Sequence, residues 1–126
     1  EVTLGIPTIV GAIRLPRRVA WADAMELLLT GETIDAGRAA AMGLVWRISD
    51  HDRLMDDARS LADRLCNAAP LAARATKEVA VRTRTMPWTE AVRFGETMRM
   101  VAAATDDATE GLQARADRRP PEWQGR

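Results

Sequence analysis

The fold of this 126-residue chain is decided by the stretch Glu110-Gly111-Leu112-Gln113-Ala114-Arg115-Ala116-Asp117-Arg118-Arg119-Pro120-Pro121-Glu122-Trp123-Gln124-Gly125. Its first part has the composition of a helix, which Thr105 or Asp106 can cap at the start. Two consecutive prolines then stop the helix near Arg119. The stretch therefore predicts a final helix followed by a non-helical tail.

The rest of the chain also predicts mainly helices. Apolar spacing and capping residues place them at about 22–29, 35–42, 50–67, 70–86 and 88–102. Gly31 and Gly43 are expected to end the first two, and Ser49 with Asp52 forms a variant capping box for the third. Residues 1–16 read as a loop with at most one helical turn, and residues 44–48 as a short extended segment. The predicted fold class is mainly α.

The apolar residues are too small to build a large core. Of the chain's hydrophobic residues, 23 are alanine and only 31 are Leu, Ile, Val, Met or Phe. The length suits one unit, but a helical chain of this kind is expected to bury its apolar faces against a partner. Nothing in Glu1–Gly5 resembles a natural beginning, so a longer polypeptide is expected.

Charge and cysteine content argue against several classes of function. The 18 basic and 18 acidic residues cancel, which disfavours nucleic acid and membrane surfaces as main partners. No apolar run reaches the roughly 20 residues that cross a bilayer. The lone Cys66 excludes an intramolecular disulfide or a cysteine-based zinc site, and we expect it to be a small core residue. A soluble, cytoplasmic protein without a metal site is predicted.

Three segments in the same order resemble enoyl-CoA hydratase/isomerase (crotonase) proteins. They are the closing stretch 110–125, the segment 24–31 leading to Asp35-Ala36 and Gly43-Leu44-Val45, and the segment 69–72 leading to Thr76-Lys77-Glu78. Only the second half of a family member is matched. The resemblance implies the C-terminal helical trimerisation region of the crotonase (α/β spiral) fold, with the N-terminal half missing.

The same resemblance divides the chain by role. Residues 1–20 would end the crotonase core and form the acyl-pocket loop, and residues 21–126 would supply oligomerisation and coenzyme A contacts. A homotrimer or a hexamer is implied. The ligand is an acyl-CoA, whose coenzyme A is part of the substrate, and no separate cofactor is implied.

The resemblance also assigns residues. Glu1 would be one of two acid–base carboxylates in the hydration of a 2-enoyl-CoA, a lyase reaction of fatty acid metabolism. Leu4, Gly5, Ile6 and Ile9 would line the acyl pocket. Arg115, Arg118 and Arg119 lie where the family contacts the nucleotide end of coenzyme A. The other glutamate and the paired N–H groups that bind the thioester oxygen would come from upstream segments.

Two departures from the family pattern bear on specificity. Many members carry Pro-Gly-Ala-Gly-Gly where this chain has Pro7-Thr8-Ile9-Val10-Gly11, which places β-branched side chains beside the expected acyl pocket. Arg115 replaces an aromatic residue that usually follows the alanine of the last helix. Isomerases, dehydratases and hydrolases share this half of the family, so the reaction stays open.

Two other functions remain open. The chain could be a non-catalytic helical interaction module derived from such an enzyme, with Glu1 a solvated side chain and the C-terminal arginines complementing the helix dipole. A helical nucleic-acid binder would instead use Arg82, Arg84 and the C-terminal arginines.

Overall fold

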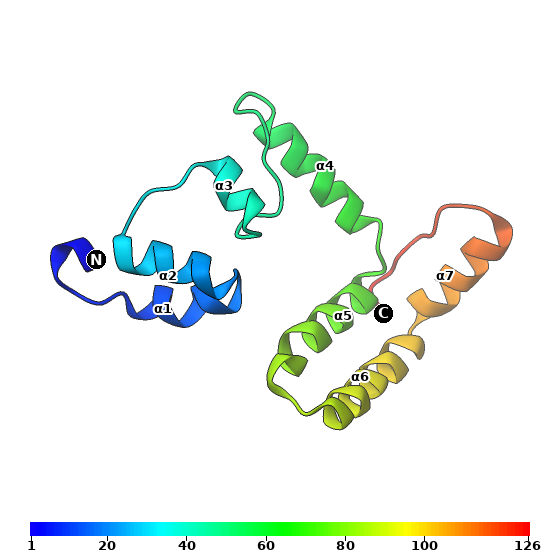
Figure 1. Ribbon diagram of the computed structural model, residues 1–126. Coiled ribbons are helices and arrows are strands. Elements are labelled where there is room, and N and C mark those ends of the chain that lie inside the picture. The colour runs from blue at the N-terminus through cyan, green and yellow to red at the C-terminus, as the bar shows by residue number, and fades with distance from the viewer. The chain divides into compact units, whose positions relative to one another are not determined.

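A computed structural model describes residues 1–126 and contains only helices and connecting segments (Figure 1). The α-helices are α1 Ile9–Arg14, α2 Trp21–Thr30, α3 Ala36–Ala41, α4 Leu54–Cys66, α5 Pro70–Arg82, α6 Trp88–Ala103 and α7 Asp106–Asp117. Three short 3₁₀ helices accompany them: η1 Val2–Leu4, η2 Leu15–Arg17 and η3 Thr83–Thr85. The predicted mainly α class is confirmed. None of the helices is long and apolar enough to cross a bilayer.

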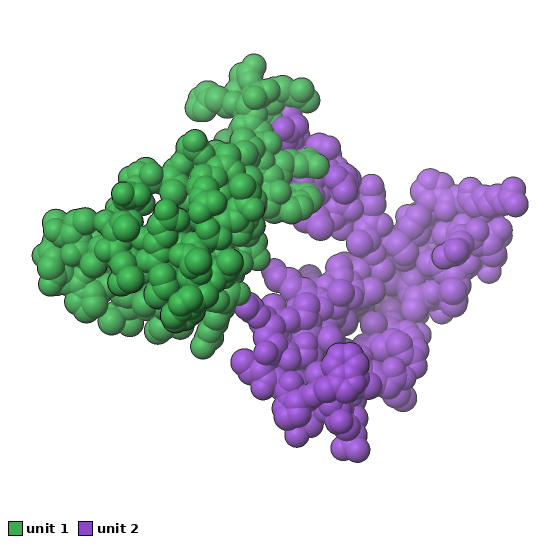
Figure 2. All heavy atoms as spheres, viewed as in Figure 1, with its two compact units in different colours: residues 1–54 green, residues 55–126 purple.

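The chain forms two compact units, residues 1–54 and residues 55–126 (Figure 2). The single unit predicted from length is therefore wrong. The division has a physical reason, since the few buried apolar side chains, Val19, Ala24, Ala39 and Ala114, cannot form one shared core.

Unit 1 is built around α2. Helix α1 approaches α2 closely at Gly11, where an added Cβ would lie 3.4 Å from Leu28 Cδ2. The Asp35 carboxylate caps α3 by accepting the Arg38 N–H at 2.7 Å, as predicted. The Arg38 side chain then reaches Asp23 on α2 at 2.6 Å. One residue of α3 therefore links the two helices.

Two expectations for unit 1 are wrong. Residues 9–14 form a helix rather than a loop, and its Ile9, Val10 and Ile13 stay more than half exposed. Residues 44–46 form bends and residues 47–48 have no regular structure, so the expected extended segment does not form a strand. Instead, the Leu44 N–H folds back onto the Ala39 carbonyl at 2.9 Å and closes the end of α3.

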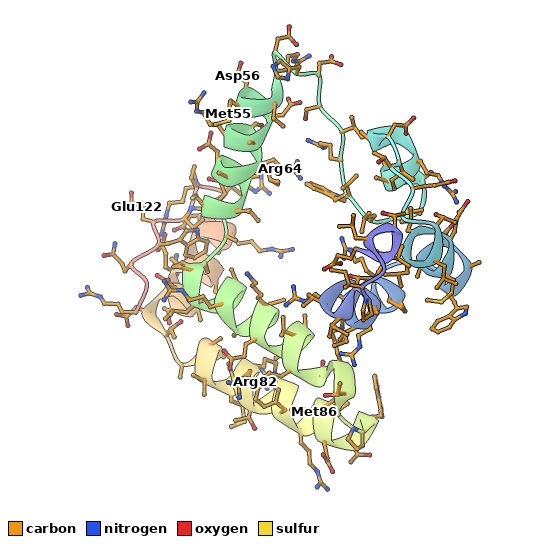
Figure 3. The ribbon with its side chains drawn as sticks, turned by 90° about the vertical axis from the view of Figure 1, so that its left-hand side faces the viewer. Met55, Asp56, Arg64, Arg82, Met86 and Glu122 are labelled. Atoms are coloured by element: carbon orange, nitrogen blue, oxygen red, sulfur yellow. The ribbon has the colours of Figure 1, made fainter.

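Unit 2 contains a helical hairpin of α5 and α6, followed by α7. Pro70 begins α5 and Pro87 precedes α6, as predicted. The helices meet closely at Gly95, where an added Cβ would lie 3.6 Å from Val79 Cγ1. Arg82, labelled in Figure 3, pairs with Glu78 at 2.8 Å at the end of α5.

Helix α4 differs from its prediction. It starts at Leu54, because residues 50–53 form a turn in which the Arg53 N–H bonds to the Asp50 carbonyl at 3.0 Å. The predicted capping box at Ser49 and Asp52 therefore precedes the helix and does not cap it. Met55, Asp56 and Arg64 project from the helix in Figure 3. Cys66, at its end, is exposed, so its predicted core role is also wrong.

The chain exposes far more surface than a compact protein of its mass. Its accessible area is 10157 Å², against roughly 6,600 Å² for a compact monomer of 13.8 kDa. Even two separately compact units of this combined mass would expose only about 8,000 Å². Large apolar side chains such as Leu4, Trp21 and Trp88 contribute to the excess. The expected need for a covering partner agrees with this surface.

Candidate functional site

The chain opens on a short turn, residues Glu1–Ile6, which we term the Glu1 turn. The Glu1 carbonyl accepts the N–H groups of Leu4 at 2.9 Å and Ile6 at 3.2 Å. Gly5 has a φ of 78°, which a residue with a side chain rarely adopts, and its N–H bonds to the Val2 carbonyl. The backbone that carries the Glu1 carboxylate is therefore held by its own turn.

Several aliphatic residues lie close to Glu1 in the sequence, and their side chains are exposed to solvent. Leu4 is 78% exposed, Ile6 56% and Ile9 62%. Glu1 is the only carboxylate among residues 1–22, so no second acid or base in this part of the chain accompanies it. The predicted site residues Glu1, Leu4, Gly5, Ile6 and Ile9 thus share one short segment of unit 1. The segment therefore carries one proton-transfer group and several exposed apolar side chains.

The predicted arginines lie in unit 2, at the end of α7. Arg115 is on the last turn, and Arg118 ends the helix with a φ of 55° and a ψ of 37°. Its N–H bonds to the Arg115 carbonyl and the Arg119 N–H to the Ala114 carbonyl, the pattern of a helix end that usually holds glycine. Arg115 and Arg118 are exposed and form no ion pair. Their guanidinium groups are available to an anion.

Arg119 is engaged differently. Its guanidinium donates to both carboxylate oxygens of Glu110, at 2.6 Å and 2.9 Å. Glu122 lies on the tail and is labelled in Figure 3, and its N–H also donates to Glu110 at 2.8 Å. These donors, the Arg119 guanidinium first, lower the pKa of Glu110 to about 2. Arg119 therefore fastens the tail to α7, a role that the sequence did not predict.

A second carboxylate holds the end of the tail. Asp107 is 1% exposed, and its oxygens accept the N–H groups of Gln124 at 2.6 Å and Gly125 at 3.0 Å. Its own N–H donates to the Arg126 carbonyl at 3.2 Å. Asp107 is thus buried with its polar atoms satisfied, and it joins residues 124–126 to the start of α7.

The Glu110–Arg119 pair has an expected pH dependence. Because the folded pKa lies below the ordinary value of 4.5, the pair stabilises unit 2 fully above about pH 4.5 and ceases to do so as the pH falls through about 2. When thermal unfolding is measured at a series of acid pH values, Tm should therefore fall less between pH 4.5 and 2 in Glu110→Gln than in the parent. Glu90→Gln, at an exposed α6 glutamate without an arginine partner, is the control, and its Tm should fall with pH as in the parent. An equal dependence of Tm on pH in all three proteins would contradict the assignment.

An open apolar groove of about 580 Å³ runs along α5 and α6. Its lining is dominated by alanine and glycine, and it consists of Ala72, Ala75, Thr76, Val79, Ala80, Gly95, Met98, Arg99, Ala102, Ala103 and Ala108. Its only charged residue, Arg99, is occupied by Glu96, whose pKa the arginine lowers. The groove offers packing surface and no acid, base or nucleophile suited to catalysis.

The structure gives little support for a metal site or a nucleic-acid-binding surface. No group of three His, Cys, Asp or Glu side chains could hold a metal ion. Arg82 is paired with Glu78 and lies 5.9 Å from the centre of the Phe94 ring, and Arg84 also has an interaction partner. These two residues therefore do not form the free basic surface that a nucleic-acid binder requires.

Comparisons with known proteins support one family throughout the chain. The family model described as enoyl-CoA hydratase/isomerase matches residues 1–126. A carnitinyl-CoA dehydratase of Citrobacter koseri is 40% identical over 131 residues, covering 100% of this chain and 50% of the relative. An (E)-benzylidenesuccinyl-CoA hydratase of Thauera aromatica is 39% identical over 115 residues, covering 91% and 45%.

A solved structure agrees. An enoyl-CoA hydratase/isomerase from Mycobacterium paratuberculosis matches with a TM-score of 0.94 and 34% identity, over 99% of this chain and 50% of that protein. The chain spans about half the length of the relatives it matches. Its helices correspond to the helical C-terminal region of the crotonase fold. The chain belongs to the enoyl-CoA hydratase/isomerase family, within the crotonase superfamily.

Proposed function

We propose that this chain is the C-terminal portion of an enzyme that adds water to a 2-enoyl-CoA, with Glu1 as one acid–base residue. The observation that carries the proposal is the Glu1 turn, which holds the backbone of a lone glutamate in the same short segment as the exposed side chains of Leu4, Ile6 and Ile9. A dehydratase and a hydratase of CoA thioesters among the relatives support water addition or removal over isomerisation.

The chemistry follows from what a carboxylate can do at this position. In hydration, water forms a C–O bond at C3 of the enoyl group, and a proton is added at C2. Glu1 would transfer a proton in one of these steps, and the second glutamate, from the N-terminal half, would assist in the other. The thioester oxygen gains negative charge in between, and paired backbone N–H groups from that half would stabilise it.

The substrate's coenzyme A portion has its own expected contacts. Arg115 and Arg118 carry unpaired guanidinium groups, which suit phosphate through their fixed fork of donors. In the family this part of the chain often reaches a neighbouring subunit. Arg119 is held by Glu110, so we propose that Arg115 and Arg118 contact the phosphates and that Arg119 keeps the tail in place.

Substitutions at Arg118 can distinguish an effect on substrate binding from an effect on stability. Arg118→Gly keeps the left-handed conformation of the helix end but removes the side chain that disfavours it, so we expect it to stabilise unit 2 by about 0.5–1 kcal/mol. The same change should raise the KM for an acyl-CoA about five- to tenfold through loss of a phosphate contact. Thermal unfolding and steady-state kinetics measure the two effects.

Arg118→Ala is the matched control, because it removes the guanidinium but keeps the unfavourable backbone. It should raise KM equally without the gain in stability. An unchanged KM in both variants would remove Arg118 from the coenzyme A contacts.

The uncovered apolar surface calls for partners as well as substrate. We propose that the N-terminal half of the protein and further copies, in a homotrimer or a dimer of trimers, cover the α5–α6 groove and the exposed aliphatic side chains. The accessible area, well above that of a compact monomer, supports this proposal.

The proposed function is tested with crotonyl-CoA and the protein expressed from its complete gene. Loss of the enoyl-thioester absorbance, with a product heavier by one water, is the expected result. The second candidate, a non-catalytic helical interaction module, is favoured by the large exposed apolar surface. Stable self-association without turnover or acyl-CoA binding would support that module and overturn the enzyme.

A further inference from the structure

The Glu1 turn rests on the end of α2, at a place where a side chain is missing. A Cβ added to Gly31 would lie 3.0 Å from Thr3 Cγ2 and 3.2 Å from Val2 Cγ1. Both distances are shorter than ordinary van der Waals contact. The turn therefore occupies the space that any larger residue at position 31 would need.

The end of α2 is itself well defined. Gly31 closes the helix with a φ of 68°, and its N–H bonds to the Leu27 carbonyl at 3.1 Å. The Thr30 hydroxyl donates to the Glu26 carbonyl at 2.7 Å and accepts the Glu32 N–H at 3.2 Å. Gly31 thus has hydrogen-bonded residues on both sides, and a contact at this position cannot be relieved by simple fraying.

A displacement of the residues that contact Gly31 would reach Glu1 directly. Val2 and Thr3 directly follow Glu1, and the Glu1 carbonyl is held by two N–H groups of the same turn. A shift of Val2 and Thr3 must therefore move the Glu1 backbone with them. We propose that Gly31 is a positioning residue, which sets the placement of the Glu1 carboxylate through its contact with Val2 and Thr3. This inference rests on the proposed role of Glu1.

The expected effect is on turnover rather than on binding. Misplacement of a catalytic group by about 1 Å can lower a rate about a hundredfold, so a shift of several tenths of an ångström should lower kcat about tenfold. Gly31 and its contacts lie in unit 1, whereas Arg115 and Arg118 lie in unit 2. The KM should consequently stay within about twofold of the parent value.

Gly31→Ala is the test, and Gly43→Ala is its matched control. Gly43 has a φ of 76°, lies in the same unit, and has nothing within 4 Å of an added Cβ. Both variants place alanine in a left-handed conformation, and only Gly31→Ala adds a close contact with Thr3 and Val2. Only Gly31→Ala should lose kcat, measured with crotonyl-CoA in the complete protein. Equal kcat values for the two variants would overturn the proposal.

A second variant pair tests the contact itself. Thr3→Ser removes Cγ2, the nearest atom to the added Cβ, and should restore most of the kcat lost in Gly31→Ala, with Thr3→Ser alone as the reference. If Gly31→Ala fails to fold, the double variant decides: recovered turnover supports the proposal, and a folded double variant with low kcat overturns it. Glu1→Gln separates the two hypotheses. If Glu1→Gln is inactive, a normal kcat in Gly31→Ala overturns only the positioning role; if Glu1→Gln keeps the parent's kcat, the proposed acid–base role of Glu1 fails.

Discussion

Replacing Glu1 by glutamine is expected to lower kcat for enoyl-CoA hydration by a factor of about 10²–10⁴. Glutamine keeps the size of the side chain and can still form hydrogen bonds, but it cannot exchange a proton as an acid–base residue. The backbone bonds of the Glu1 turn do not involve the side chain, so the turn should be retained. Thermal unfolding should consequently be unchanged, and kcat measured with crotonyl-CoA should show the loss.

Glu32→Gln is the control for this experiment. Glu32 is an exposed glutamate in the same unit, just beyond the end of α2, and its side chain forms no ion pair. Its replacement should leave kcat within about twofold of the parent. If Glu1→Gln retained a similar activity, Glu1 would not be an acid–base residue, and the reaction would depend on carboxylates elsewhere in the complete protein.

Replacing Asp107 by asparagine is expected to destabilise unit 2 by about 2–3 kcal/mol. The buried carboxylate accepts one N–H with each oxygen, from Gln124 and from Gly125. Asparagine offers a single oxygen, so its NH₂ group would face one of these N–H donors without water to relieve it. Denaturant unfolding measures the loss, and hydrogen exchange at Gln124 and Gly125 shows whether the tail has been released.

Asp106→Asn provides the matched comparison. Asp106 is the preceding residue in the same first turn of α7, but its side chain is 74% exposed and pairs with Arg126 at 3.4 Å. Both replacements remove a charge near the start of the helix, and only Asp107→Asn disturbs buried hydrogen bonds. We expect less than about 0.5 kcal/mol for Asp106→Asn. Equal losses would mean that the helix dipole, and not the attachment of the tail, explains the effect.

Most helices could be predicted because their ends have local signals. Asp35 caps α3, Thr105 caps α7 by accepting the Ala108 N–H, and Gly31 ends α2 in the left-handed conformation. Pro70 and Pro87 mark where α5 and α6 begin. Each of these signals acts within about four residues, a range in which sequence spacing reflects distance in space.

The wrong predictions fall where such local signals compete. Ser49 and Asp52 have capping-box spacing, yet the Asp50–Arg53 turn delays α4 to Leu54. The β-branched residues of α1 disfavour a helix intrinsically, but Thr8 precedes them with extended backbone at the N-cap position. In both places the observed structure depends on neighbouring turns, which hydrophobic periodicity does not describe.

The candidate site was only partly accessible from the sequence. The family resemblance singled out Glu1 and the C-terminal arginines. It could not show that Arg119 is paired with Glu110 while Arg118 is unpaired. Asp107 was not singled out at all. Its partners lie 17 and 18 residues away in an irregular tail, and no periodic pattern connects them. Gly31 was predicted as a helix end, but its contact with the Glu1 turn is visible only in the three-dimensional structure.

The contact between the tail and the segment that joins α4 to α5 has a consequence for biosynthesis. The Trp123 indole N–H donates to the Asn67 carbonyl at 3.0 Å, across 56 residues of sequence, and its ring covers Gly111. Residues 123–126 emerge from the ribosome after the α5–α6 hairpin, since a chain leaves the exit tunnel from its N-terminal end onward. Unit 2 can reach its final stability only after residues 123–126 have left the exit tunnel. Nascent chains stalled before that point should thus remain sensitive to protease at α7.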